Sequence, residues 1–223
     1  MVKNCTHRGV IGIESAVVMI SAVVVASALV FVLFSAGVST AQKTQTTTGS
    51  ALADVRTNLS IDGMIVGIAS VQEDMLNATA IPLRMAIAGG TSINLDPNIT
   101  AVRLATSSVE HGSIQLHVFA LGTYSDLDDV MQKAMSEGLL SKNPILETAA
   151  TESTQAILFF IKNNNDNFIL DSAEHAFLVI IFQDSERPRS LDRIKIEVIL
   201  ASGSSLTVER AIPNITKTFV NLE

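Results

Sequence analysis

Residues 8–38 read RGVIGIESAVVMISAVVVASALVFVLFSAGV, and from Val10 onward every residue of this stretch except Glu14 is apolar or small. A helix needs roughly 20 apolar residues to cross a hydrocarbon core, and this run is longer than that. An ordinary secretory signal has a shorter apolar region, of about 7 to 15 residues, followed by its cleavage site. The stretch therefore predicts a helix that is apolar on every side and lies in lipid or inside a bundle of helices.

Glu14 is the one charged residue within this apolar run. An isolated carboxylate inside lipid is costly and usually marks a function. Two interpretations stay open at this point. The helix is either a plain membrane anchor, with the basic residues Lys3 and Arg8 on the cytoplasmic side, or part of a precursor that is cut upstream of the run, within residues 7–10.

The helix is expected to continue beyond the apolar run. Residues 39–50 are polar and rich in Thr and Gln, and helical spacing then resumes at Leu52, Val55 and Leu59. We expect one helix as far as Ser60. A helix of about 50 residues is roughly 75 Å long, which exceeds the thickness of any bilayer.

Beyond residue 61 the apolar residues alternate with polar ones, as in half-buried strands. This alternation marks Val102 and Leu104; Ile114, Leu116 and Val118; Ile194, Ile196, Val198 and Leu200; and Leu206 and Val208. Residues 156–161 and 176–182 are continuous apolar runs that predict central strands, and residues 126–139 have helical spacing. Short strands with turn signals between them predict a β-sandwich or barrel. The expected fold class is α+β, a long hydrophobic helix followed by an all-β, immunoglobulin-like domain.

Several motifs resemble one known family. Arg8-Gly9 before VIGIESA (residues 10–16) and a long helix is similar to the class III leader of type IV pilin-like proteins. Within that group, the motifs that resemble the archaeal flagellins, or archaellins, are Gly37, residues 40–44, residues 59–63, residues 186–189, residues 194–200 and residues 208–213. The resemblance implies three parts: a leader (1–9), a helix that forms the membrane span and filament core (10–60), and an outer β-domain (61–223).

The resemblance also assigns roles to residues near the start of the chain. It implies that a prepilin-peptidase-type membrane protease cuts between Gly9 and Val10, and that Glu14, then the fifth residue, aids assembly. The new ammonium group of Val10 can pair with Glu14 of a neighbouring subunit in surroundings where neither charge is favourable alone. The precursor would lie in the cell membrane with its N-terminus in the cytoplasm.

The function implied by this resemblance is structural and not enzymatic. The chain would be one subunit of a homopolymer, the archaellum, an extracellular filament used for swimming and built by archaellum or pilus assembly machinery. Two alternatives stay open from the sequence: an adhesive type IV-like pilus subunit for surface attachment, and a single-pass, membrane-anchored binding domain.

Composition limits the partners and the chemistry. The 223 residues are 48% hydrophobic, enough for one long helix and one domain of modest size. Loss of Lys3 and Arg8 with the leader changes the net charge from −7 to −9, so we expect no nucleic-acid partner. The single cysteine, Cys5, lies in the expected leader, and the mature chain would therefore have no disulfide or zinc–thiolate site.

Four sequons follow the apolar run, at Asn58, Asn77, Asn98 and Asn214. The tripeptide accepts glycans on the surface of exported proteins, and archaellins are often N-glycosylated. We therefore expect at least one of these four to carry a glycan.

Residues with catalytic or metal-binding potential show no recognisable pattern. His111, His117 and His175 have no close spacing to each other or to a fixed Ser and Asp, and no phosphate-binding loop is present. The richest acidic group comprises Asp126, Asp128 and Asp129, with Asp166 and Asp171 further along. The spacing of these acids differs from that of an EF-hand loop. The preferred interpretation is that they begin a helix, where negative charge is favourable. We expect no cofactor, although a divalent ion at these acids stays open.

Overall fold

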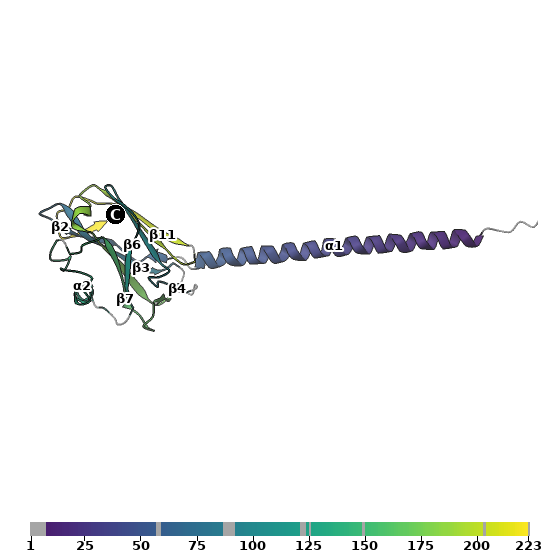
Figure 1. Cartoon of the computed structure of the whole chain (residues 1–223), viewed down its shortest axis with the longest axis horizontal. Helices are drawn as coiled ribbons and strands as arrows, with labels where there is room; N and C mark the ends of the chain where they lie inside the picture. The colour runs from purple at the N-terminus through teal and green to yellow at the C-terminus, as the bar shows by residue number, and fades with distance from the viewer. Residues whose placement is uncertain are drawn as a thin grey trace, which may run out of the picture. The chain divides into compact units, whose positions relative to one another are not determined.

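The computed structural model describes residues 8–56, 59–86, 92–120, 124, 126–148, 150–202 and 204–222. The chain divides into two compact units between Leu52 and Ala53. Figure 1 shows the long helix and the β-rich part of the chain. The first unit is helical and the second, called the head domain below, is mostly β. This arrangement confirms the expected α+β fold class.

The first unit consists mainly of α1 (Arg8–Arg56), a single α-helix of 49 residues. Several of its hydroxyl groups bond to the helix itself: Ser21 Oγ donates to the Val17 carbonyl at 2.7 Å, and Thr40 Oγ1 donates to the Ala36 carbonyl at 2.9 Å. Such bonds let polar residues sit in a helix without any outside partner. The sequence therefore predicted this helix and its apolar character correctly.

The helix ends at Arg56, before the end expected near Ser60. Leu59 instead begins β1 (Leu59–Ile61), where it is buried and pairs with Met85 in an antiparallel register. The spacing that suggested a helical position for Leu59 also suits a buried strand position. Tertiary burial decides between the two.

In the described part of the chain, the head domain contains twelve strands, one α-helix and one 3-10 helix. After β1 these are β2 (Ile65–Ser70), β3 (Met75–Met85), β4 (Ile93–Asn94), β5 (Ala101–Thr106), β6 (Glu110–Phe119), α2 (Leu127–Ser136), β7 (Gln155–Lys162), β8 (Ile169–Leu170), β9 (His175–Ile181), η1 (Asp184–Glu186), β10 (Arg193–Ile199), β11 (Ser205–Ala211) and β12 (Phe219–Leu222). Ten strands form one sheet in the order β11-β10-β5-β6-β7-β9-β3-β2-β12, with β1 beside β3, and β4 pairs with β8 separately.

Strand β6 links the two halves of this sheet. Its first part pairs antiparallel with β5, as Ile114 opposite Val102 shows, and its second part pairs parallel with β7 over Gln115 to Phe119. One hydrophobic cluster contains side chains from both halves, including Ile194 and Leu158. The sheet therefore curls around a shared core, as the sandwich or barrel expectation requires.

The strands β7 and β9 are buried on both faces. Leu158 and Phe160 belong to the cluster between the two halves, while Ile157 and Phe159 belong to a second cluster with Met131 of α2. A strand covered on both faces needs a continuous apolar run, which is why these two strands lack alternation. The expected central strands are confirmed.

Helix α2 lies within the expected range 126–139 and covers part of the outer face of β7 and β9 (Figure 1). Asp126 begins the helix, because its side chain accepts a hydrogen bond from the Asp129 N–H at 3.0 Å. Gly138 follows its end with a φ of +76°, a conformation that glycine adopts without steric cost. The last turn is closed by the Leu139 N–H, which donates to the Ala134 carbonyl at 2.9 Å.

Candidate assembly surface and head-domain sites

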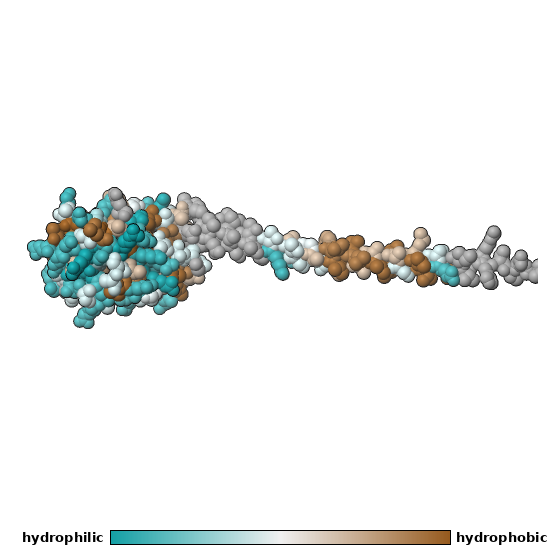
Figure 2. Space-filling view, turned by 90° about the horizontal axis from the view of Figure 1, so that it is seen from above, coloured by the Kyte–Doolittle hydropathy of each residue, from teal (hydrophilic) through white to brown (hydrophobic). Residues whose placement is uncertain are grey.

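The most exposed apolar surface of the described chain lies on α1. Large apolar side chains from Ile13 to Val38 are exposed, from 40% at Val38 to 72% at Phe31, and Figure 2 shows this band in brown. Soluble monomers rarely expose a continuous apolar patch of more than a few hundred Å². Ile13–Thr44 is also long and apolar enough to cross a membrane. This surface is suited to contact lipid or other helices.

Four hydroxyl groups along this helix already have hydrogen-bond partners within it. Besides Ser21 and Thr40, Ser27 Oγ donates to the Val24 carbonyl at 2.8 Å and Thr44 Oγ1 donates to the Thr40 carbonyl at 3.0 Å. In an apolar medium an unbonded hydroxyl would be costly. These four hydroxyl groups can therefore lie in an apolar environment without a further partner.

The residues expected to take part in processing and assembly lie at the start of α1. Gly9 and Val10 belong to its first turn, Glu14 follows about one turn later, and the Glu14 side chain is exposed. The helix thus presents a carboxylate near the beginning of the apolar band.

The four sequons differ in accessibility. Asn58 lies outside the described residues, whereas Asn98 and Asn214 are exposed. Asn77 is buried, with an exposed fraction of 6%; its Nδ2 donates to the Pro144 carbonyl at 3.1 Å and its Oδ1 accepts from Arg187 Nη1 at 3.1 Å. The folded head domain therefore leaves the Asn77 amide enclosed and offers Asn98 and Asn214 to solvent.

The three histidines within the described residues, His111, His117 and His175, do not form a shared site. His111 Nε2 contacts Glu186 Oε2 at 2.9 Å, and His175 Nδ1 contacts Asp62 Oδ2 at 2.9 Å. His117 lies on β6, where burial lowers its pKa more than the charge of Glu137 raises it. His111 and His175 thus each belong to a separate ion pair, and His117 is a residue of a strand.

The acids do not converge on one ion site. Asp128 accepts hydrogen bonds from Gln132 Nε2 at 2.8 Å and from Asn143 Nδ2 at 2.6 Å, beside the Asp126 cap. Asp171, on a different loop, accepts from Asn165 Nδ2 at 2.9 Å. Within the described ranges, no three His, Cys, Asp or Glu residues are placed to hold a metal ion. The helix-start interpretation of Asp126 is confirmed.

The structure also contains a buried arginine that the sequence did not single out as a site. Arg187 Nη1 pairs with Glu73 Oε2 at 2.5 Å, and its Nη2 pairs with Asp184 Oδ1 at 2.9 Å, while its side chain is only 5% exposed. Arg187 stands in the motif Glu186-Arg187-Pro188-Arg189, but no spacing rule marks it as buried. Its role is to tie the β2–β3 turn to η1.

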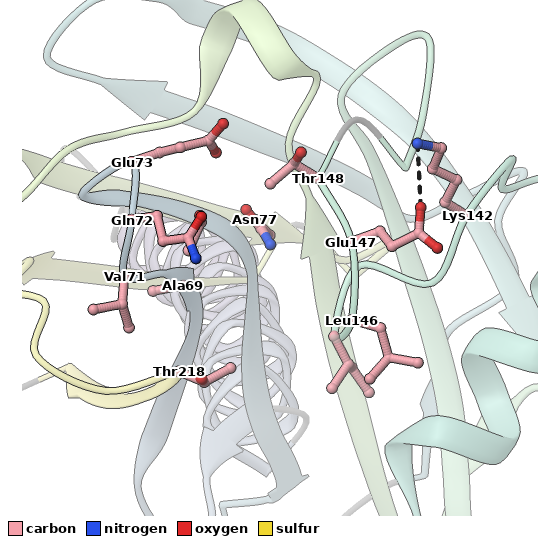
Figure 3. Close-up of a pocket in the computed structure, with 12 residues that line it drawn as sticks. Ala69, Val71, Gln72, Glu73, Asn77, Lys142, Leu146, Glu147, Thr148 and Thr218 are labelled. Atoms are coloured by element: carbon pink, nitrogen blue, oxygen red, sulfur yellow. Dashed lines mark ion pairs between the residues drawn. The ribbon is translucent and has the colours of Figure 1, made fainter.

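Beside Arg187 lies a hollow of about 480 Å³ between residues 69–73 and 142–148 (Figure 3). Glu73 and Asn77 lie on one side of it, and Lys142 pairs with Glu147 at 3.2 Å on the other. Both members of this ion pair are about half exposed. Exposed ion pairs contribute little energy, and the hollow holds no nucleophile activated by a neighbouring base among the residues that line it.

An apolar helix followed by a β-rich head domain is the arrangement expected of pilin-like filament subunits, and comparison with known proteins identifies the family. The model of the archaeal-type flagellin family matches residues 9–210, so the chain belongs to that family. As a flagellin of the archaeal type, it is a structural subunit of the archaellum, an extracellular filament built as a polymer of such subunits. The apolar helix fits a membrane-anchored precursor.

Similar proteins agree with this assignment. "Probable flagellin 1" of Aeropyrum pernix is 30% identical over 211 residues, covering 93% of each chain. "Probable flagellin 1" of Archaeoglobus fulgidus is 32% identical over 96 residues, covering 43% of this chain and 47% of the relative.

Two solved structures share the fold. The flagellin FlaB1 of Methanocaldococcus jannaschii has a TM-score of 0.55 at 14% identity, covering 74% of this chain and 95% of the other. The archaeal flagellum of Methanospirillum hungatei strain JF1 gives a TM-score of 0.53 at 18% identity, covering 95% of this chain and 98% of the other.

Proposed function

We propose that this flagellin is made as a membrane precursor with its N-terminus in the cytoplasm, is cut between Gly9 and Val10, and then polymerises with identical copies into a swimming archaellum. It catalyses no reaction in this role. The observation that carries the proposal is the continuous apolar surface of α1, exposed along Ile13 to Val38. The family assignment supports the same role.

The helix serves in two environments. In the membrane its side chains contact acyl chains, and in the filament they contact other copies of α1. Both surroundings are apolar, so moving the helix changes little hydrophobic energy, and the net gain comes from close packing and from the many contacts of a polymer. The internal hydrogen bonds of Ser21 and Thr40 hold in either place.

Glu14 directs this packing through charge. Cleavage frees the ammonium group of Val10, and the carboxylate of Glu14 on a neighbouring copy pairs with it. An unpaired charge within an apolar core is strongly unfavourable, so the pair favours one axial alignment of adjacent helices. A prepilin-peptidase-type protease supplies the cut, and archaellum assembly machinery supplies the export work.

The head domain forms the outer surface of the filament. Its exposed sequons at Asn98 and Asn214 are the glycan acceptors that the accessibility of the amides supports. The acidic charge of the chain, −7 before processing, keeps neighbouring filaments dispersed in solution.

Mass spectrometry of sheared, purified filaments tests the proposal. We expect the subunit to begin at Val10, while the membrane fraction also contains a longer precursor that retains residues 1–9. A filament subunit that begins at Met1, or a chain found only as uncut membrane monomers, would contradict it.

A deletion strain tests the biological role. We expect loss of swimming when the gene is removed, and its return when the gene is supplied again. Intact swimming with lost surface attachment would instead assign the chain to an adhesive pilus.

A further inference from the structure

Leu191 occupies an unusual position on the head domain. It is the third residue of a tight turn, Arg189 to Asp192, closed by the Asp192 N–H donating to the Arg189 carbonyl at 3.1 Å. Its φ is +70°, which turns of this kind normally assign to glycine or asparagine. The Leu191 side chain is nevertheless 75% exposed, so its strained backbone supports no local packing.

The turn is held firmly by its surroundings. The Leu191 N–H donates to the Ile212 carbonyl at 2.9 Å, and the Arg189 N–H donates to Asp192 Oδ2 at 2.9 Å. Ser190 Oγ bonds to Asp74 and also accepts from the Ile215 N–H at 3.1 Å. These bonds fix Leu191 as a projecting apolar side chain and not as part of a freely moving loop.

The head domain also carries an apolar groove of about 280 Å³ beside the start of α2, and Leu191 is not part of its lining. Its apolar lining includes Val66, Ile68, Phe159, Ile161, Phe177 and Phe219. The rings of Phe159 and Phe177 stack at 5.7 Å in its wall, and Phe219 is 56% exposed at its edge. The groove is slightly smaller than the roughly 300–1,000 Å³ of small-molecule sites, and it offers few polar groups to orient a ligand. A protein side chain suits it better.

The charges beside the two features are complementary. Exposed Arg189 and Arg193 flank the projecting Leu191, and Arg193 is already paired with Glu209 at 3.5 Å. Exposed Asp126 and Asp129 belong to the start of α2, beside which the groove lies. Asp126 lines the groove itself, and Asp129 belongs to the first turn of α2. Opposite charges around an apolar contact steer two surfaces together and fix their orientation.

We propose that Leu191 of one subunit inserts into this apolar groove of a second copy of the chain, with Arg189 of the first copy facing Asp129 of the second. Leu191 is not among the residues that line the groove, and in an open filament such a contact runs head-to-tail and propagates from copy to copy. This inference rests on the proposed function, because it requires a polymer of identical chains.

Disulfide trapping in intact filaments tests the contact. The chain's single cysteine is Cys5, so the background is Cys5→Ser, and the test variant carries Leu191→Cys with Ile161→Cys. Within one chain these two positions lie near opposite ends of β3. Met75, at the start of β3, bridges to Arg189, close to Leu191. Leu83, near the end of β3, pairs with Ala176, which in turn pairs with Phe160, next to Ile161. The eight-residue separation along β3 is about 25 Å, far beyond disulfide reach.

After mild oxidation we expect a ladder of dimers, trimers and larger species on a non-reducing gel. Each single-cysteine variant should stay monomeric. Leu146→Cys with Ile161→Cys is the matched control, because Leu146 is 77% exposed on ordinary backbone and is not part of the groove. An equal ladder from the control, or dimers from Leu191→Cys alone, would overturn the proposed contact.

Intact filaments that show no ladder would also overturn the proposed contact, but they would leave the proposed function unchanged. Absence of the unaltered chain from filaments would overturn the proposed function itself.

If the cysteine pair blocks assembly, the heat stability of filaments tests the contact instead. Arg189→Glu should lower the disassembly temperature, and adding Asp129→Arg should restore most of the loss. Failure of this restoration would reject the pairing.

Discussion

Arg187 Nη1 donates a hydrogen bond to Asn77 Oδ1 at 3.1 Å in the interior of the head domain, 110 residues away in sequence. The same asparagine donates from Nδ2 to the Pro144 carbonyl at 3.1 Å. A residue that reads as a glycan acceptor is thereby part of a buried network that joins β3, η1 and the loop after α2. Two predictions depend on this contact.

The first prediction concerns glycan occupancy. We expect glycopeptides from purified filaments to carry sugar on Asn98, Asn214 or both, and Asn77 to be unmodified, because its amide is enclosed and already bonded. Peptide mapping by mass spectrometry measures this directly. A glycan on Asn77 in assembled filaments would show that this part of the head domain opens.

The second prediction concerns stability. Arg187→Ala should lower the free energy of unfolding by about 3 kcal/mol, because it leaves the Asn77 oxygen unbonded and removes a buried cation from Glu73 and Asp184. Urea unfolding of the detergent-solubilised chain measures the change. Lys142→Ala, at an exposed pair with Glu147 at 3.2 Å, is the control and should change stability by less than about 0.5 kcal/mol.

The third prediction concerns acid. Burial raises the pKa of Glu186, but hydrogen bonds from Thr154 and His111, with the charge of His111, outweigh it and hold that pKa below its ordinary value of 4.5. As the pH falls, Glu186 therefore binds a proton more readily in the unfolded chain than in the folded one. The stability that ionised Glu186 contributes is complete above about pH 4.5, and it is lost as the pH falls towards the lower pKa of the folded state.

Glu186→Gln should accordingly unfold with a weaker pH dependence between about pH 5 and about pH 3 than the unaltered chain. Thermal unfolding across this range measures the slope. Glu152→Gln, at an exposed carboxylate, serves as the control. Equal slopes for both variants would contradict a special contribution from Glu186.

The fourth prediction concerns close packing at Gly67. A Cβ atom there would lie 2.8 Å from Leu76 Cδ2 and 3.4 Å from Leu222 Cδ2. Leu76 is fully buried and has little room to move, so Gly67→Ala should destabilise the chain by about 1–3 kcal/mol. Gly112→Ala meets nothing within 4 Å and should leave unfolding nearly unchanged.

The fifth prediction concerns assembly. Glu14→Leu should keep the precursor in the membrane at normal levels and reduce filament yield about tenfold, equivalent to about 1.4 kcal/mol, because the ammonium group of Val10 loses its partner. Met19→Leu, an apolar replacement in the same helix, should assemble normally. Normal filaments from Glu14→Leu would remove the role proposed for this carboxylate.

The sequence predicted the elements whose burial follows a simple pattern. The apolar run of α1, the two-sided burial of β7 and β9, and the Asp126 start of α2 could all be read directly. The parallel pairing of β6 with β7 could not, because the residues between them, which include α2, leave the partner strand undetermined. Pairing across such a distance depends on the whole core.

The candidate sites show a similar division. The exposed apolar surface of α1 follows from the composition of that segment. The burial of Asn77 does not follow from its tripeptide, because Asn-Ala-Thr occurs both on the surface and in the interior of domains. Leu191 is likewise an ordinary leucine in sequence. Only its positive φ and exposed side chain distinguish it.

The four hydroxyls of α1 that donate to their own helix have one more consequence. A neighbouring copy of α1 contacts mostly methyl and methylene groups there, and none of these hydroxyls needs a hydrogen bond across the interface. Helices that slide along one another would break no hydrogen bond made by these hydroxyls. A filament that bends can therefore distribute the strain among many weak, non-directional contacts.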